Sequence, residues 1–104
     1  NMEEQFRTDL KQEGNFIVVN YWRQYQEKHT NYVYRGGHLS LIGAYNQTTD
    51  HVLILDTNST KFPHHWIPLK DLIRMMTTYD RTASMSRGYL IVHNPNELQK
   101  CIHL

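Results

Sequence analysis

The sequence predicts an α+β domain: an antiparallel β-sheet lobe with flanking helices. Short runs of β-branched and aromatic residues, typical of strands, alternate with segments whose apolar residues recur at helical spacing. The strand-like runs of the central hairpin are joined by turn residues rather than by a crossover helix, so these strands should pair antiparallel. The helices must then cover apolar faces of the sheet.

The N-terminal third predicts a helix followed by a strand. Residues 2–12 place Phe6 and Leu10 one helical turn apart among charged side chains, with Met2 as a further candidate on that stripe, and the pattern ends at Gly14. Residues 15–22 (NFIVVNYW) are too short for a buried helix and predict a strand. The polar residues 23–35 are expected to form a long connection or a frayed strand pair.

A β-hairpin follows. Gly36 and Gly37 provide backbone freedom at its entry, residues 39–45 and 51–56 read as strands, and NQTTD between them supplies turn residues. Both faces of this hairpin are largely apolar.

The C-terminal half predicts two helices around one strand. Prolines in TKFPHHWIP exclude a helix interior before Pro68, after which residues 69–76 have a helical period. We expect a polar loop over 79–86, a strand over 88–93 and a terminal helix over 95–104. Three residues of that last helix should share one side: Leu98, Cys101 and Ile102.

An ionisable residue lies at each end of the hairpin, His38 at the start and Asp56 at the finish. With a hairpin loop of three or five residues, paired positions sum to 96 or 98, and both side chains project from the same face. In the first register Asp56 lies opposite Ser40 and diagonal to His38, about 7–8 Å away between backbones and within hydrogen-bonding reach. A loop of four residues would place the two on opposite faces.

A histidine oriented by a carboxylate is the base half of a nucleophile, base and orienter triad. The simpler interpretation is that Asp56 closes the turn in DTNS and that His38 is an exposed residue at a strand end. Spacing alone favours this simpler interpretation.

Five motifs in order change that balance: GGHLSLIGAY, DHVLILD, KFPHHWIPL, MMTTYD and SRGYL. Over about residues 15–92 they resemble the second half of the phytochelatin synthase domain, a papain-like cysteine transpeptidase. The resemblance implies that His38 is the triad base and Asp56 its orienter. It also implies that Asp80 and Arg87 hold the γ-glutamyl end of glutathione, whose amino and carboxylate groups they complement. A local ion pair between Asp80 and Arg87 is the alternative.

Three departures from the family pattern are visible, and we interpret them as substitutions in a distant member. Leu39-Ser40-Leu41 replaces Phe-Ser-Pro after the histidine, residues 57–60 replace an Ala- and Arg-containing stretch, and His64 stands where the second proline is expected.

The nucleophile is missing from the expected place. The family's cysteine precedes the histidine, in the other lobe, and this sequence has no cysteine before His38. Cys101, near the end of the predicted terminal helix, would meet an opposing helix dipole and is expected to pack rather than to react. Residues 1–104 are therefore expected to form one domain, the His/Asp half of a phytochelatin-synthase-like catalytic domain, inactive alone. An excised lobe, a natural truncation with a binding role and a half-enzyme completed by another chain remain open.

The resemblance also implies the reaction and the partners. The family's cysteine attacks glutathione, releases glycine and passes a γ-glutamylcysteinyl group to a second glutathione or to water. No cofactor is expected to bind tightly, and heavy-metal ions are implied only as glutathione thiolates. The expected partners are glutathione and the missing N-terminal lobe or a second chain. A non-catalytic binding or assembly module, exposing an apolar face, is the second hypothesis.

Composition excludes other classes. The formal net charge is +1 without a basic run, so nucleic acid is not an expected partner. No run of 18 apolar residues suggests a membrane span, and the single cysteine favours a reducing, cytoplasmic compartment. The seven histidines suggest another hypothesis, a metal site formed by His64 and His65 together with His51 or His29. Adjacent histidines in an extended segment point to opposite sides, which argues against it.

Overall fold

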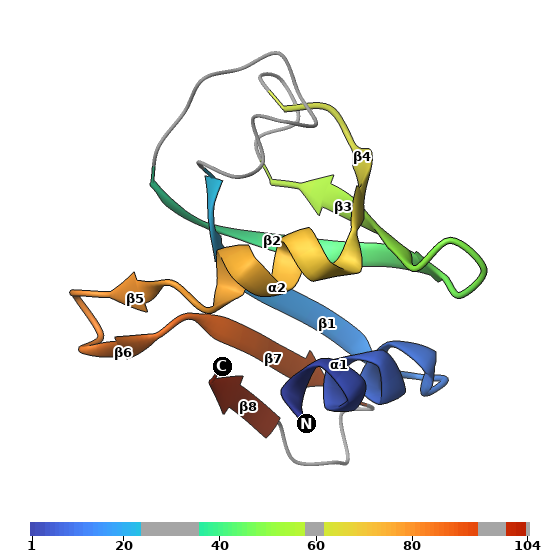
Figure 1. Ribbon diagram of the computed structural model, residues 1–104, viewed down its shortest axis with the longest axis horizontal. Helices are drawn as coiled ribbons and strands as arrows, with labels where there is room; N and C mark the ends of the chain where they lie inside the picture. The colour runs from blue at the N-terminus through green and yellow to red at the C-terminus, as the bar shows by residue number, and fades with distance from the viewer. Residues whose placement is uncertain (24–35, 58–61, 94–99, 104) are drawn as a thin grey trace.

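A six-stranded antiparallel sheet forms the centre of the molecule, in the order β4-β3-β2-β1-β7-β8 (Figure 1). The computed structural model describes residues 1–23, 36–57 and 62–93, and the backbone of 100–103. The elements in chain order are α1 (Met2–Lys11), β1 (Phe16–Trp22), β2 (Gly37–Asn46), β3 (His51–Asp56), β4 (His65–Pro68), α2 (Leu69–Met76), β5 (Tyr79–Asp80), β6 (Met85–Ser86), β7 (Gly88–Val92) and β8 (Lys100–His103). The predicted α+β class with an antiparallel sheet is confirmed.

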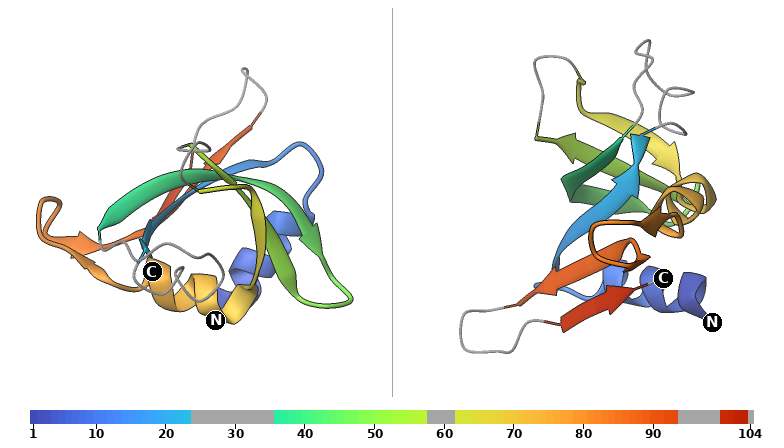
Figure 2. Two further views of the ribbon diagram at one scale, coloured as in Figure 1. Left: turned by 90° about the horizontal axis from the view of Figure 1, so that it is seen from above. Right: turned by 90° about the vertical axis from the view of Figure 1, so that its left-hand side faces the viewer.

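Both helices lie on the concave side of the curved sheet, and the core lies between them and the strands (Figure 2). Alternate residues of β1 face this core, beginning with Ile17 and Val19, and they meet Phe6 of α1. The largest share of the helical contribution comes from α2, with Leu69, Leu72, Met75 and Met76 all fully buried. Neither described helix is long or apolar enough to cross a bilayer.

Local chemistry explains where the helices begin. The Asn1 side chain accepts a hydrogen bond of 2.9 Å from the Glu4 backbone N–H, which caps α1. Pro68 occupies the capping position of α2, where its missing N–H costs nothing, and the helix spans the predicted residues 69–76. Met2 is exposed, so the apolar stripe of α1 is carried by Phe6 and the partly buried Leu10.

The hairpin between β2 and β3 has the predicted pairing near His38 and Asp56, but its loop length differs from the prediction. Its loop has four residues, 47–50, because Asn46 pairs with His51 and the two numbers sum to 97. The register shifts between Ile42 and Ala44, where Gly43 is the extra residue of a β-bulge. Beyond the bulge Ser40 pairs with Asp56, a sum of 96, as expected for the first register. The predicted loop length was therefore wrong, and the bulge compensates for it.

Two C-terminal predictions were wrong. Residues 79–86 contain the small hairpin β5–β6 instead of a plain loop. The predicted terminal helix over 95–104 is contradicted by β8, whose Ile102 pairs with Tyr89 of β7. Without β8, strand β7 would be an edge with unpaired backbone groups, and pairing satisfies them. Residues 94–99 and, in the connection predicted over 23–35, all residues after Arg23 lie outside the described part of the chain.

Candidate active site

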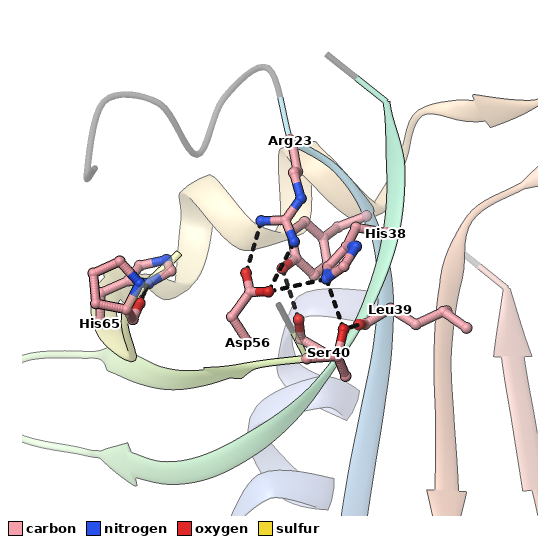
Figure 3. Close-up of polar contacts among 9 residues, drawn as sticks. Arg23, His38, Leu39, Ser40, Asp56 and His65 are labelled. Carbon is pink, nitrogen blue, oxygen red and sulfur yellow. Dashed lines mark hydrogen bonds and ion pairs between the residues drawn. The ribbon is translucent and has the colours of Figure 1, made fainter. Parts of the chain in front are cut away.

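His38 and Asp56 meet at one end of the β2–β3 pair. The Nε2 atom of His38 lies 3.1 Å from Oδ1 of Asp56 (Figure 3). The Asp56 side chain is fully buried, whereas the His38 side chain keeps 21% of its surface exposed. The carboxylate therefore stands behind the ring, and the imidazole presents its other side to solvent.

Sequence reasoning missed Arg23, the main partner of this carboxylate. Its Nη1 and Nη2 atoms donate to Oδ2 and Oδ1 of Asp56 over 2.7 and 2.8 Å, in a bidentate pair (Figure 3). Both side chains are buried, and the guanidinium carbon lies 3.8 Å from the centre of the Phe62 ring. A signal was available, because Arg23 continues the inward alternation of β1 and a buried carboxylate requires a cation.

Thr57 was also missed, and it constrains the histidine tautomer. Its hydroxyl donates to the Leu39 carbonyl over 3.1 Å, so its oxygen is the acceptor in the 2.9 Å contact with Nε2 of His38. Asp56 accepts at the same ring nitrogen. Two acceptors at Nε2 place the proton of the neutral ring there. Nδ1, which has no partner within the described residues, then carries the lone pair.

A buried tyrosine supports the ring from the side. Tyr21 of β1 pairs with His38 across the strands, and the two rings meet edge to face with centroids 5.9 Å apart. The Tyr21 hydroxyl and Ser40 Oγ share a buried hydrogen bond of 2.9 Å. This hydrogen bond links β1 and β2 next to His38 and fixes the Tyr21 ring against the imidazole.

The electrostatic surroundings keep His38 neutral. Burial and the positive charge of Arg23 lower the pKa of His38 below its usual value, and they outweigh the opposite effect of Asp56. At neutral pH the imidazole can therefore accept a proton.

A pocket of about 710 Å³ opens beside the imidazole. It brings His38 together with Asp80 and Arg87, two of the other residues predicted for the site, while Asp56 lies behind the ring. The complete lining is Asn20, Gly37, His38, Leu39, Thr57, Asp80, Thr82 and Arg87.

Asp80 and Arg87 do not pair with each other within the described residues, so the local ion pair weighed as an alternative does not form. One oxygen of Asp80 accepts from the backbone N–H groups of Thr82 and Ala83, over 3.0 and 3.4 Å, and shapes the β5–β6 turn. Its second oxygen has no protein partner in the described chain.

Arg87 is buried at the base of the same pocket. Its Nη1 atom donates to Thr78 Oγ1 over 3.1 Å and to the Tyr79 carbonyl over 2.7 Å. Its Nε atom is buried with no partner in the described parts of the chain. A methyl group on Gly37 would come within 3.2 Å of Nη2, so glycine allows the guanidinium to lie close to β2.

Cys101 lies on strand β8, opposite Leu90, so the helix-dipole argument against its reactivity does not apply. The position of β8 in the sheet gives a different reason why Cys101 is not expected to act on His38. Strands β7 and β1 lie between β8 and β2. At about 4.8 Å per step, β8 is roughly 14 Å from the strand that bears His38. The backbone of Cys101 is therefore separated from the strand of His38 by two intervening strands.

The described residues do not support the metal site considered from the sequence. Within the described residues no three His, Cys, Asp or Glu side chains gather as ligands. The Nδ1 atoms of His51 and His65 are instead hydrogen-bonded to the carbonyls of Thr49 and Pro63, over 2.7 and 2.6 Å. His29 lies outside the described residues.

An antiparallel α+β lobe with a carboxylate-backed histidine beside a pocket is compatible with the histidine-bearing lobe of a papain-like enzyme. The family model for phytochelatin synthase matches residues 1–89, and the chain belongs to this family.

Curated relatives carry the corresponding name. The chain is 48% identical over 56 residues to glutathione gamma-glutamylcysteinyltransferase 3 of Lotus japonicus, which covers 54% of this chain and 12% of that protein. It is 42% identical over 60 residues to glutathione gamma-glutamylcysteinyltransferase 1 of Arabidopsis thaliana, 58% of this chain and 12% of that protein. The fission yeast enzyme of that name, from Schizosaccharomyces pombe, is 32% identical over 56 residues, 54% of this chain and 14% of that protein. The matched part spans only about an eighth of the length of these relatives.

Proposed function

We propose that this chain carries the His/Asp part of a Cys-His-Asp triad that transfers the γ-glutamylcysteinyl group of glutathione to a second glutathione or to water. One observation carries the proposal: in a chain of the phytochelatin synthase family, Nε2 of His38 lies 3.1 Å from a buried Asp56, and the ring borders a large pocket. The proposal treats residues 1–104 as one domain.

The chemistry assigned to His38 is proton transfer. A cysteine thiol gives its proton to Nδ1, and the thiolate attacks the carbonyl carbon of the cysteinyl-glycine bond. The C–N bond breaks, a thioester forms, and the imidazolium returns the proton to the amine of the departing glycine. In the second step the imidazole takes a proton from the attacking amine or water, which forms a bond to the thioester carbonyl carbon. The C–S bond then breaks, and the imidazolium returns the proton to the departing cysteine sulfur. Asp56 keeps the ring oriented throughout.

Asp80 and Arg87 are assigned to the γ-glutamyl end of the substrate. The open oxygen of Asp80 suits its α-ammonium group, and the donors of Arg87 not bound to Thr78 or Tyr79 suit its α-carboxylate. Heavy-metal ions would enter as thiolates of glutathione, which makes them part of the substrate. A cytoplasmic location belongs to the same proposal, because glutathione keeps thiols reduced there.

The nucleophile is proposed to come from a segment outside these 104 residues, because Cys101 is too far from His38. The chain by itself is therefore expected to release no glycine from glutathione. Release by the isolated chain that survives Cys101→Ala would contradict this assignment.

The decisive test uses the protein encoded by the full open reading frame. Glycine release from glutathione is compared for the unchanged protein, His38→Ala and Asp56→Asn, with Arg74→Ala on the exposed side of α2 as the control. We expect His38→Ala to lower the rate by about 10²–10⁴-fold, the usual contribution of a general base. Full activity of His38→Ala would exclude the proposed role.

A non-catalytic binding or assembly module is the second candidate. The observation in its favour is that the sheet face opposite the helices exposes large apolar side chains, among them Phe16, Leu39 and Trp66. If the full-length protein neither releases glycine nor binds glutathione but associates through this face, the second candidate replaces the first.

A further inference from the structure

The carboxylate of Asp56 is shared unequally between its two basic neighbours. Arg23 contacts both of its oxygens, over 2.7 and 2.8 Å, whereas His38 contacts only Oδ1, over 3.1 Å. Charge-assisted bidentate pairs of this kind are the stronger and more directional of the two arrangements. The carboxylate is therefore bound first to the guanidinium, and its contact with the imidazole is secondary.

Arg23 is held in this position from several sides. The guanidinium carbon lies 3.8 Å from the Phe62 ring centre and 6.0 Å from that of Tyr21, and the residue is 2% exposed. It directly follows β1, and its backbone N–H donates to the Gly36 carbonyl over 2.9 Å. Backbone and side chain are both fixed, so the guanidinium cannot leave without abandoning a buried carboxylate.

A histidine beside a lone carboxylate becomes easier to protonate, because the negative charge favours the imidazolium. Here the adjacent positive charge of Arg23 opposes that effect. The other described groups that face the ring are Tyr21 and Thr57, which are neutral, and the charged residues across the pocket are Asp80 and Arg87. Of these charges, Asp56 contacts the ring directly, and Arg23 contacts that same carboxylate.

We propose that Arg23 is a positioning residue for the dyad: it fixes the Asp56 carboxylate and offsets its charge, so that His38 faces the pocket as a neutral imidazole with Nδ1 available as the base. The inference rests on the proposed function only in naming His38 as a base. A site built this way would start from a thiol and a neutral imidazole, and the proton would move as the thiol attacks. The lowered pKa of His38 is consistent with this arrangement.

The test is an NMR titration of the histidine side chains in the full chain, with three substitutions. Arg23→Met removes both the positive charge and the bidentate hydrogen bonds to Asp56. Arg23→Lys keeps the charge and removes the bidentate geometry. Arg74→Met, which removes an exposed arginine, is the control. We expect Arg23→Met to raise the midpoint of His38 by about 1 pH unit or more, and Arg23→Lys to raise it by less. Arg74→Met should leave it unchanged, and the remaining histidine signals report whether each variant is folded.

The inference is overturned if the His38 midpoint in folded Arg23→Met equals that of the unchanged chain. If Arg23→Met does not fold, Arg23→Gln decides, because glutamine removes the positive charge and keeps hydrogen-bond donors, and an unmoved midpoint in folded Arg23→Gln overturns the inference. A loss of thermal stability without a change in titration assigns Arg23 a structural role only, which also overturns it. Failure of the proposed function is seen separately, as glycine release that persists in His38→Ala while the titration still responds to Arg23.

Discussion

His38 uses one ring nitrogen for support and leaves the other for chemistry. Asp56 and Thr57 both accept at Nε2, from the end of β3 and from the residue that follows it. Thr57 occupies one of the positions where the sequence departs from the family pattern, and it supplies a hydrogen bond to the imidazole. At the scale of single residues, the orientation of the base depends on two acceptors and not on the carboxylate alone.

Replacing Thr57 by valine removes the neutral acceptor and keeps the shape of the side chain. We expect Thr57→Val to lower glycine release in the full-length protein by about 3- to 10-fold, which matches the loss of one hydrogen bond of about 0.6–1.4 kcal/mol. Thr57→Ser keeps the hydroxyl and is the matched control, with activity near that of the unchanged protein. Equal losses in both variants would show that the methyl group, and not the hydroxyl, matters.

The lowered pKa of His38 predicts a dependence of stability on pH. In the unfolded chain this histidine titrates at its usual value of 6.5, whereas in the folded chain its pKa is lower. The unfolded state therefore binds the proton more readily between the two values, and the free energy of unfolding falls as the pH drops below 6.5.

Urea unfolding at pH 7.5 and at pH 5.5 measures this effect. The unchanged chain should lose more stability between the two pH values than His38→Gln, which cannot titrate. Asp50, whose pKa is lowered chiefly by the hydrogen bond from Arg7, titrates below this window. An identical loss in both proteins would show that the imidazole is as easily protonated in the fold as in the unfolded chain.

The hairpin is the element that brings the dyad together. Its loop of four residues would by itself place His38 and Asp56 on opposite faces, and the bulge at Gly43 restores their shared face. A methyl group built on Gly43 would lie 2.7 Å from Cγ of Leu55, closer than such atoms can approach. With Leu55 packed in this place, position 43 accommodates only glycine without a shift of the surrounding atoms.

Gly43→Ala should destabilise the chain by about 1–3 kcal/mol, the usual cost of inserting a methyl group into a packed site. The change is measured as a shift of the urea midpoint at constant slope. The double variant Gly43→Ala, Leu55→Ala removes the clash, so its loss should be smaller than the sum of the two single losses. Additive losses would place the strain in the backbone of the bulge rather than in this contact.

The whole molecule is a sheet covered on one side. Both described helices lie on the concave face (Figure 2). By the alternation of β1 and β4, Phe16 and Trp66 lie on the other face, with 60% and 46% of their surfaces exposed. An apolar face left open in this way is typical of an interaction surface. In the second candidate function this face is where a second chain would pack.

At this scale we predict association that depends on concentration. Sedimentation of the 104-residue chain should show a growing dimer fraction from micromolar to hundreds of micromolar, and Phe16→Glu should shift the distribution toward monomer. Ala83→Glu, the same change of charge in the exposed β5–β6 turn, is the control. A compact monomer at every concentration would argue against this surface as an interface.

Local patterns predicted much of the fold. The span of α2 is as expected from the helical period after Pro68, and β1 and β7 agree with their apolar runs to within a residue. The prediction for the terminal segment was wrong because Ile102 fits a helical stripe as well as it fits a strand. Only pairing with the backbone of β7 selects the strand. Long-range pairing decides such ambiguous segments.

The candidate site divides in the same way. By itself the sequence determined that His38 and Asp56 lie at the same end of two neighbouring strands, because alternation and family motifs mark those positions. Only the tertiary structure decided that the guanidinium of Arg23 would be buried against Asp56, that Thr57 would meet the imidazole, and that a bulge at Gly43 would correct the register. The physical reason is that periodicity encodes which face of an element is buried, whereas ion pairs, bulges and edge pairing depend on contacts between segments that are distant in the chain.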